Sequence, residues 1–112
     1  MPHNIDPENM FKAIWEFPEN IQEALEIGAG ITLHNHYENI DHIVIAGMGG
    51  SAIGGDVVSV LENESLKVPF QVVRGYTCPS WVNENTLVIC SSYSGNTEET
   101  LSALDHALEK KA

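Results

Sequence analysis

Apolar residues in the first part of the chain recur three or four positions apart, which is the period of an α-helix. This spacing predicts one helix over residues 10–15 and, where Pro18 interrupts the run, a second over 18–28. Asp6 and Pro7 are typical of a helix start, because an aspartate accepts hydrogen bonds from free amides and proline tolerates the first helical position. The chain therefore opens with an accessory helical segment.

After about residue 40 the pattern changes to short runs of consecutive apolar residues, which are typical of strands buried on both faces. Helical spacing returns over 53–61 and again from about Thr97, so we expect one helix after the first strand and one after the third. Asn96 and Glu99 have the spacing of a capping pair for the last helix. The three predicted strands are 42–47, 70–75 and 86–91.

This order of strands and helices predicts an α/β fold, with a parallel sheet between flanking helices in a three-layer, flavodoxin-like or Rossmann-like arrangement. If the second strand lies outside the first, the strand order is 2-1-3 and the third strand is an open edge. Three strands are few for such a sheet, and an apolar edge is a pairing hazard. We therefore expect a truncated domain or an edge hidden in an oligomer. The predicted domains are a helical lead-in at 1–40 and the first part of an α/β domain at 41–112.

The chain has 112 residues and a formal net charge of −11, from 5 basic and 16 acidic residues. Nucleic acids and anionic membranes attract basic surfaces, so this balance argues against both as partners. The N-terminus lacks the basic and apolar regions of a signal peptide, and no apolar run is long enough to span a membrane. Cys78 and Cys90 are not in C-x-x-C spacing, which favours reduced thiols and a cytoplasmic protein.

Histidines offer little sign of a metal site. His34 and His36 have H-x-H spacing, but no third ligand follows in a recognisable pattern. We therefore predict an exposed loop there, with no metal and no cofactor. His106, on the last predicted helix, is expected at the surface.

Two polar turns follow the first and third predicted strands. The first, GMGGSAIGGD (47–56), has five glycines in ten residues, and the second, SSYSGNTEET (91–100), is rich in hydroxyl groups. In open α/β sheets, ligands bind at the carboxyl ends of strands where the strand order reverses, and both turns fall at that point in the order 2-1-3. Each turn also opens a helix, whose free N–H groups attract anions. We therefore predict one phosphate site built from both turns.

Hydroxyl groups from both turns are the expected phosphate ligands. Gly49 and Gly50 let the backbone approach an anion closely, and Tyr93 is expected to shape the wall of the pocket. Because a hydrogen bond to a charged group contributes roughly 1.5–3 kcal/mol, several such donors hold a phosphate without Lys or Arg. Glu98 and Glu99 would oppose the anion, so they are expected to point away from it. The predicted ligands are Ser51, Ser92, Ser94 and Thr97.

At these two turns the sequence resembles sugar isomerase (SIS) domains, and most closely those of bifunctional phosphoglucose/phosphomannose isomerases. The stretch FPENIQEAL (17–25) is similar to the helical lead-in of that family. The resemblance covers essentially the whole chain but only about the first third of a complete enzyme. It implies a homodimer of full-length chains, each with two SIS domains. It also implies metal-independent interconversion of glucose 6-phosphate and mannose 6-phosphate with fructose 6-phosphate.

Residue by residue, the resemblance implies that the four hydroxyls named above bind the phosphate and that Gly49 and Gly50 line the sugar site. The family's catalytic arginine, base glutamate, ring-opening histidine and late lysine all fall beyond Ala112, so no catalytic residue is assigned here. We therefore expect this chain to bind a sugar phosphate without turning it over.

Other interpretations remain open. Residues 47–52 also fit the dinucleotide pattern G-x-G-x-x-A, and Arg74 would suit a 2′-phosphate, but this leaves the second turn unexplained. A non-catalytic sugar-phosphate sensor is a further alternative, although the acidic segment 1–40 lacks a basic recognition helix for DNA. Ser92 and Ser94 are also common as plain turn and capping residues.

Overall fold

The computed structural model describes residues 5–34 and 37–112. Contacts divide the chain into two units, Met1–His36 and Tyr37–Ala112, and each is described here by itself. That the second unit is the first part of a larger domain stays a prediction.

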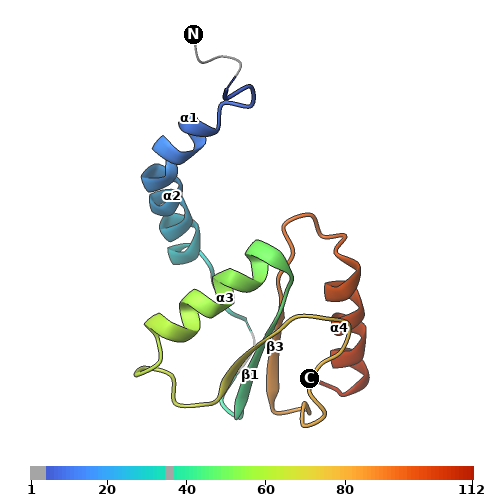
Figure 1. Ribbon diagram of the computed structural model, residues 1–112. Coiled ribbons are helices and arrows are strands. Elements are labelled where there is room, and N and C mark those ends of the chain that lie inside the picture. The colour runs from blue at the N-terminus through green and yellow to red at the C-terminus, as the bar shows by residue number, and fades with distance from the viewer. Residues whose placement is uncertain (1–4, 35–36) are drawn as a thin grey trace. The chain divides into compact units, whose positions relative to one another are not determined.

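The first unit contains two helices, α1 (Met10–Trp15) and α2 (Phe17–Ala29) (Figure 1). The Asp6 carboxylate accepts hydrogen bonds from the Met10 and Phe11 amides, at 2.6 and 2.9 Å. Asp6 thus accepts amides of the first helical turn as expected, although Asn9 holds the N-cap position. The first helical position expected for Pro7 is wrong, because the helix begins at Met10. Pro18 does lie in the first turn of α2.

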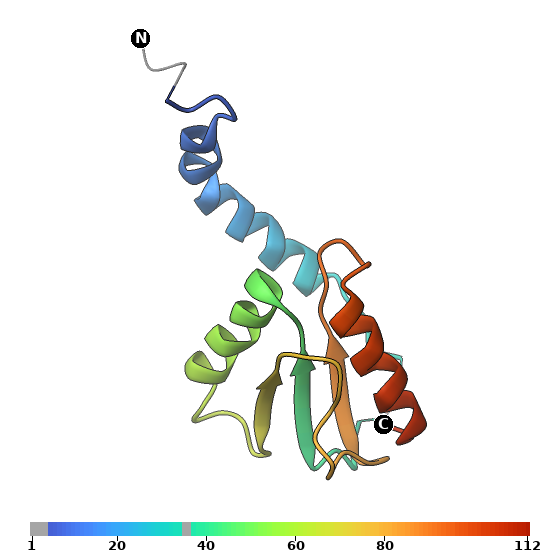
Figure 2. The ribbon, with the colours of Figure 1, turned by 45° about the vertical axis from the view of Figure 1, so that its right-hand side comes forward.

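The second unit is built on three parallel strands, β1 (His42–Ala46), β2 (Phe70–Val73) and β3 (Thr86–Cys90). Their order is β2-β1-β3, which confirms the predicted order 2-1-3 and the α/β fold. Ala46, at the end of β1, lies beside Val73 on one side and Cys90 on the other. Figure 2 shows the three arrows pointing to the end of the sheet at which α3 (Gly49–Leu61) and α4 (Glu98–Glu109) begin.

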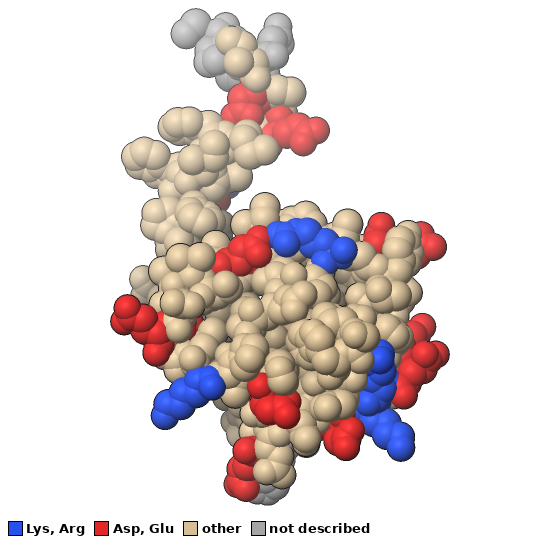
Figure 3. All heavy atoms as spheres, turned by 60° about the horizontal axis from the view of Figure 1, so that its bottom comes forward, with Lys and Arg blue, Asp and Glu red and all other residues tan. Residues whose placement is uncertain are grey.

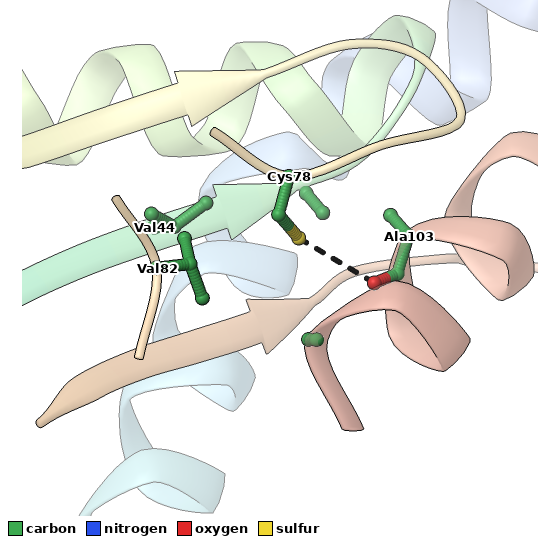
Figure 4. Packing of buried hydrophobic residues seen from close by; sticks show 6 residues of the cluster. Val44, Cys78, Val82 and Ala103 are labelled. Carbon is green, nitrogen blue, oxygen red and sulfur yellow. Dashed lines mark hydrogen bonds between the residues drawn. The ribbon is translucent and has the colours of Figure 1, made fainter. Parts of the chain in front are cut away.

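The two helices cover opposite faces of the sheet. Gly55 of α3 lies so close to β1 and β2 that a Cβ there would be 3.2 Å from Ile45 Cγ2 and 3.0 Å from Val72 Cγ2. Side chains alternate between the two faces along a strand. Val44 and Ala46 therefore face away from α3, towards α4. Figure 4 shows this second layer, which also includes residues from the β2–β3 loop. Its buried cluster is Val44, Ala46, Cys78, Val82, Ala103 and Ala107.

Both helices turn their small residues to the sheet and leave large apolar ones exposed. Ala52 and Gly55 are buried in α3, as are Ala103 and Ala107 in α4. Small side chains let a helix backbone lie close to a sheet. The spacing of large apolar residues therefore predicts both helices correctly, but these residues are not on the buried faces. The exposed apolar residues include Ile53, Val57, Val58 and Leu61 of α3 and Leu101, Leu104 and Leu108 of α4.

The β2–β3 loop is held by three side chains four residues apart, two in α4 and one, Lys110, at its C-cap. Residues at this spacing lie one above the other along a helix. The middle one, His106, is half-buried and accepts a hydrogen bond, so its expected place as a free surface residue is wrong. The three bonds are Ser102 Oγ to the Tyr76 carbonyl (2.9 Å), the Cys78 amide to His106 Nδ1 (2.8 Å) and Lys110 Nζ to the Ser80 carbonyl (3.3 Å).

On the face shown in Figure 3, acidic side chains are spread around the molecule, with a few basic ones between them. None of the helices within the described residues is both long and apolar enough to cross a membrane.

Candidate functional site

The two polar turns lie side by side at the carboxyl ends of β1 and β3. The Ser91 amide donates to the Ala46 carbonyl at 2.8 Å, which ties the start of the second turn to the end of β1. Between the turns is a cavity of about 510 Å³. The cavity is lined by Met48, Gly50, Ser51, Tyr93, Ser94 and Thr97.

The first turn depends on glycine at two positions. A Cβ at Gly47 would lie 3.2 Å from both the Ala52 nitrogen and the Ser91 carbonyl oxygen, so the first turn packs directly against the second. Gly49 has a φ of +55°, which L side chains rarely adopt, and α3 begins there. Within the described residues, no side chain caps this helix start. The Ser51 amide donates to the Met48 carbonyl at 3.2 Å, and the helix start has no side-chain acceptor from its N-cap.

Hydroxyl groups organise the second turn. Ser92 Oγ accepts the Gly95 amide at 3.0 Å and lies 2.8 Å from Thr97 Oγ1. Ser94 Oγ accepts the Asn96 amide at 3.1 Å, and Gly95 has a φ of +72°. A hydroxyl that accepts an amide hydrogen keeps its own proton to donate. The two amide bonds thus hold Ser92 and Ser94 in place and leave their hydroxyl protons unused.

These bonds limit how many protons the hydroxyls offer. In the Ser92–Thr97 pair one hydroxyl donates to the other, so the pair keeps a single proton for a ligand. Ser94 Oγ lies 3.5 Å from Ser92 Oγ, and this second contact uses one further proton. With Ser51, the site therefore supplies about two hydroxyl donors and the amides of two helix starts, from groups that carry no charge.

The cap predicted for the last helix is wrong. Thr97, not Asn96, occupies the N-cap position of α4, and no described side chain bonds its first-turn amides. The physical reason is that Asn96 is held in the turn by its amide bond to Ser94, while the Thr97 hydroxyl bonds Ser92. The predicted partner, Glu99, lies within the helix, which begins at Glu98.

The acidic pair at the start of α4 acts on the β2–β3 loop. The charges of Glu98 and then Glu99 raise the pKa of Tyr76 above its usual value, helped by partial desolvation and a side-chain hydrogen bond to Glu99. Neither carboxylate lines the cavity. Their placement is the one that a phosphate between the turns requires.

Arg74 follows β2 at the same end of the sheet. Its guanidinium forms an ion pair with the Asp56 carboxylate of α3, and neither group lines the cavity. The 2′-phosphate contact of the dinucleotide interpretation would have to compete with this pair.

The predicted site residues are placed as follows. One cavity is lined by Ser51, Ser94, Thr97 and Gly50. Ser92 and Gly49 are not part of this lining: Ser92 bonds the hydroxyl of Thr97, and Gly49 provides a positive φ in the first turn. Sequence reasoning anticipated Tyr93 as a wall but missed Met48, whose only signal was its place between two glycines.

The expected absence of a metal stays a prediction. Across residues 5–34 and 37–112, no three His, Cys, Asp or Glu side chains gather in a way that would hold an ion. His36, half of the H-x-H pair, lies outside the described residues, while His34 is exposed.

Comparison with known proteins finds relatives that are named as enzymes of sugar phosphates. Over 103 residues, 92% of its length, it is 50% identical to the bifunctional phosphoglucose/phosphomannose isomerase of Caldicellulosiruptor bescii. It is 52% identical over 67 residues, 59% of its length, to the protein of the same name from Aquifex aeolicus. A D-glucosamine-6-phosphate 4-epimerase from Sulfolobus acidocaldarius is 39% identical over 69 residues, 62% of the chain.

The chain spans 30%, 21% and 21% of the lengths of these three relatives. No protein-family model matches it, and no solved structure does. The resemblance seen at the two turns is nevertheless confirmed: the chain belongs with the bifunctional phosphoglucose/phosphomannose isomerases and is consistent with an N-terminal portion of such a protein.

Proposed function

We propose that the two turns bind the phosphate of a sugar phosphate, as the phosphate-holding part of an isomerase that interconverts glucose 6-phosphate and mannose 6-phosphate with fructose 6-phosphate. The observation that carries this proposal is the cavity that Ser51 of the first turn shares with Ser94 and Thr97 of the second. Hydroxyl donors there converge with two helix starts, which is the environment that an anion needs.

The relatives support a sugar phosphate as the ligand class. They carry the names of different reactions, an isomerisation and a 4-epimerisation, yet all are named for sugars that carry phosphate. These relatives are similar to this chain in sequence, and each is named for a phosphorylated sugar. We therefore assign the segment that they have in common with this chain to binding the sugar phosphate rather than to one reaction.

Proton transfer is assigned to residues outside this chain. Moving a proton between C1 and C2 requires a positioned base and an acid that opens the ring. The cavity lining contains no carboxylate, histidine, lysine or arginine. The turns therefore orient the sugar through its phosphate, and binding at this remote group contributes to catalysis only when the reacting groups are supplied elsewhere.

The proposed setting is a cytoplasmic homodimer of a longer chain. Cys78 and Cys90 are both free thiols, which suits a reducing compartment. Ile89 on the edge strand β3 is 43% exposed, and a second surface covering this edge would bury it.

The test is an amide NMR titration of the 112-residue chain with inorganic phosphate, glucose 6-phosphate and fructose 6-phosphate. We expect shifts at 47–51 and 92–97, and weaker binding in Ser51→Ala. Ser59→Ala is the matched control, because Ser59 lies further along α3 and does not line the cavity. No shift in a well-dispersed spectrum would overturn the phosphate site.

A coupled assay for conversion of fructose 6-phosphate to glucose 6-phosphate tests the division between binding and chemistry. We expect no turnover by this chain alone. Turnover by the pure chain would show that its own residues move the proton and that the proposed division is wrong.

A further inference from the structure

We propose that the ring of Tyr93 packs against the carbon chain of the bound sugar and so distinguishes a sugar phosphate from phosphate alone. This inference rests on the proposed function, since it assumes that Ser51, Ser94 and Thr97 hold the phosphate end of the ligand. It adds a specificity-determining residue between two of the proposed phosphate ligands.

The exposure of Tyr93 shows that packing does not account for its place. The residue is 103% exposed, so the folded chain covers essentially none of its surface. A tyrosine normally buries a large area, and aromatic rings dominate the energetics of cores and binding sites. Tyr93 instead stands at the cavity, where it forms part of the lining. A ring in this position is free to contact a ligand at no cost in internal packing.

The turn fixes where the ring is presented. On one side of Tyr93, Ser92 accepts the Gly95 amide, and on the other, Ser94 accepts the Asn96 amide. Ser92 is further bonded to Thr97 at the start of α4. The backbone that carries the ring is thus held by hydrogen bonds on both sides, so a contact with a ligand costs little ordering of the loop.

The lining of the cavity combines polar and apolar groups. Ser51, Ser94 and Thr97 present hydroxyls, whereas Met48 and Tyr93 present apolar or aromatic groups. The face of an aromatic ring is electronegative and attracts weakly positive C–H groups, which the carbon chain of a sugar displays along its faces. A volume of about 510 Å³ lies within the range of small-molecule sites, so phosphate and sugar fit together.

The test compares dissociation constants for glucose 6-phosphate and inorganic phosphate, measured by NMR titration of the wild type, Tyr93→Ala and Tyr93→Phe. We expect Tyr93→Ala to raise the constant for glucose 6-phosphate about tenfold more than that for inorganic phosphate, or about 1.4 kcal/mol. Tyr93→Phe, which keeps the ring, restores the preference. Tyr76→Ala removes a tyrosine that does not line the cavity and is the matched control.

Three results would overturn the role of Tyr93: no change in Tyr93→Ala, an equal loss for both ligands, or a loss in Tyr93→Phe as large as in Tyr93→Ala. The last would assign the effect to the hydroxyl instead of the ring. If the wild type binds neither ligand, the phosphate site fails and this inference fails with it. If the wild type binds phosphate but its preference is unaffected by the ring, only the role of Tyr93 is lost.

Discussion

Replacing Gly47 with alanine tests whether close contact between the two turns holds the site together. A Cβ at this position would lie 3.2 Å from the Ala52 nitrogen, 3.2 Å from the Ser91 carbonyl oxygen and 3.3 Å from the Ser51 carbonyl carbon. All three are backbone atoms, so a side-chain rotation cannot relieve the crowding. The start of α3 must move away from the end of β3 instead.

The size of the effect follows from overpacking. Forcing a methyl group into a filled space costs about 1–3 kcal/mol, and the loss of glycine's freedom in the unfolded chain returns about 0.4–1 kcal/mol. We therefore expect Gly47→Ala to lose about 1–2 kcal/mol of unfolding free energy. With a urea m value of about 1–3 kcal/mol per molar, the midpoint falls by roughly 0.3–2 M.

Urea unfolding followed by circular dichroism measures this loss, and Gly54→Ala is the matched control. Gly54 lies in α3 with open space around its Cβ position, so alanine there raises helix stability by about 0.5–1 kcal/mol. The two variants make the same chemical change and are expected to move the midpoint in opposite directions. A Gly47→Ala midpoint equal to or above that of the wild type would refute the contact between the turns.

Two further predictions concern the second layer of the unit. His106→Ala removes the acceptor of the half-buried Cys78 amide, so we expect the free energy of unfolding in urea to fall by about 1 kcal/mol. The exposed control His34→Ala is expected to cause no change. An unchanged midpoint in His106→Ala would show that water replaces the imidazole. Burial raises the pKa of both the Cys78 and Cys90 thiols above the ordinary value of 9.0, so the folded state favours the neutral thiol. The resulting stabilisation of the folded state is fully present below pH 9. It is lost as the pH rises through the higher folded-state pKa. The midpoint is thus expected to fall from pH 8 to pH 10 by more in the wild type than in the double variant Cys78→Ala/Cys90→Ala, and an equal fall in both would contradict the burial argument.

The sheet and the place of the site could be predicted from sequence because both depend on local, repeating signals. Runs such as 86–91 read directly as strands, and two turns that open helices after parallel strands must meet at one end of the sheet. The order β2-β1-β3 was expected on the condition that the second strand lies outside the first, and the structure meets that condition.

Features that depend on long-range packing could not be read in this way. The stripe that includes Ile53 and Leu61 has helical spacing whether or not it is buried, and only the approach of Gly55 to the sheet decides which face is covered. His106 bonds an amide 28 residues away, a contact that no local pattern signals. Thr97 takes the N-cap position in place of Asn96, whose amide is held in the turn by Ser94.

The neutral lining of the cavity has a consequence for how ionic strength acts on it. A chain with a net charge of −11 repels a phosphate at long range, and this repulsion is screened as the Debye length shrinks from about 30 Å at 0.01 M salt to about 8 Å at 0.15 M. Hydrogen bonds from Ser51, Ser94 and the helix amides to the proposed phosphate would act at short range and be barely screened. We therefore expect added salt to tighten binding at the proposed phosphate site, up to the point where salt anions compete, whereas it loosens an anion held by lysine or arginine.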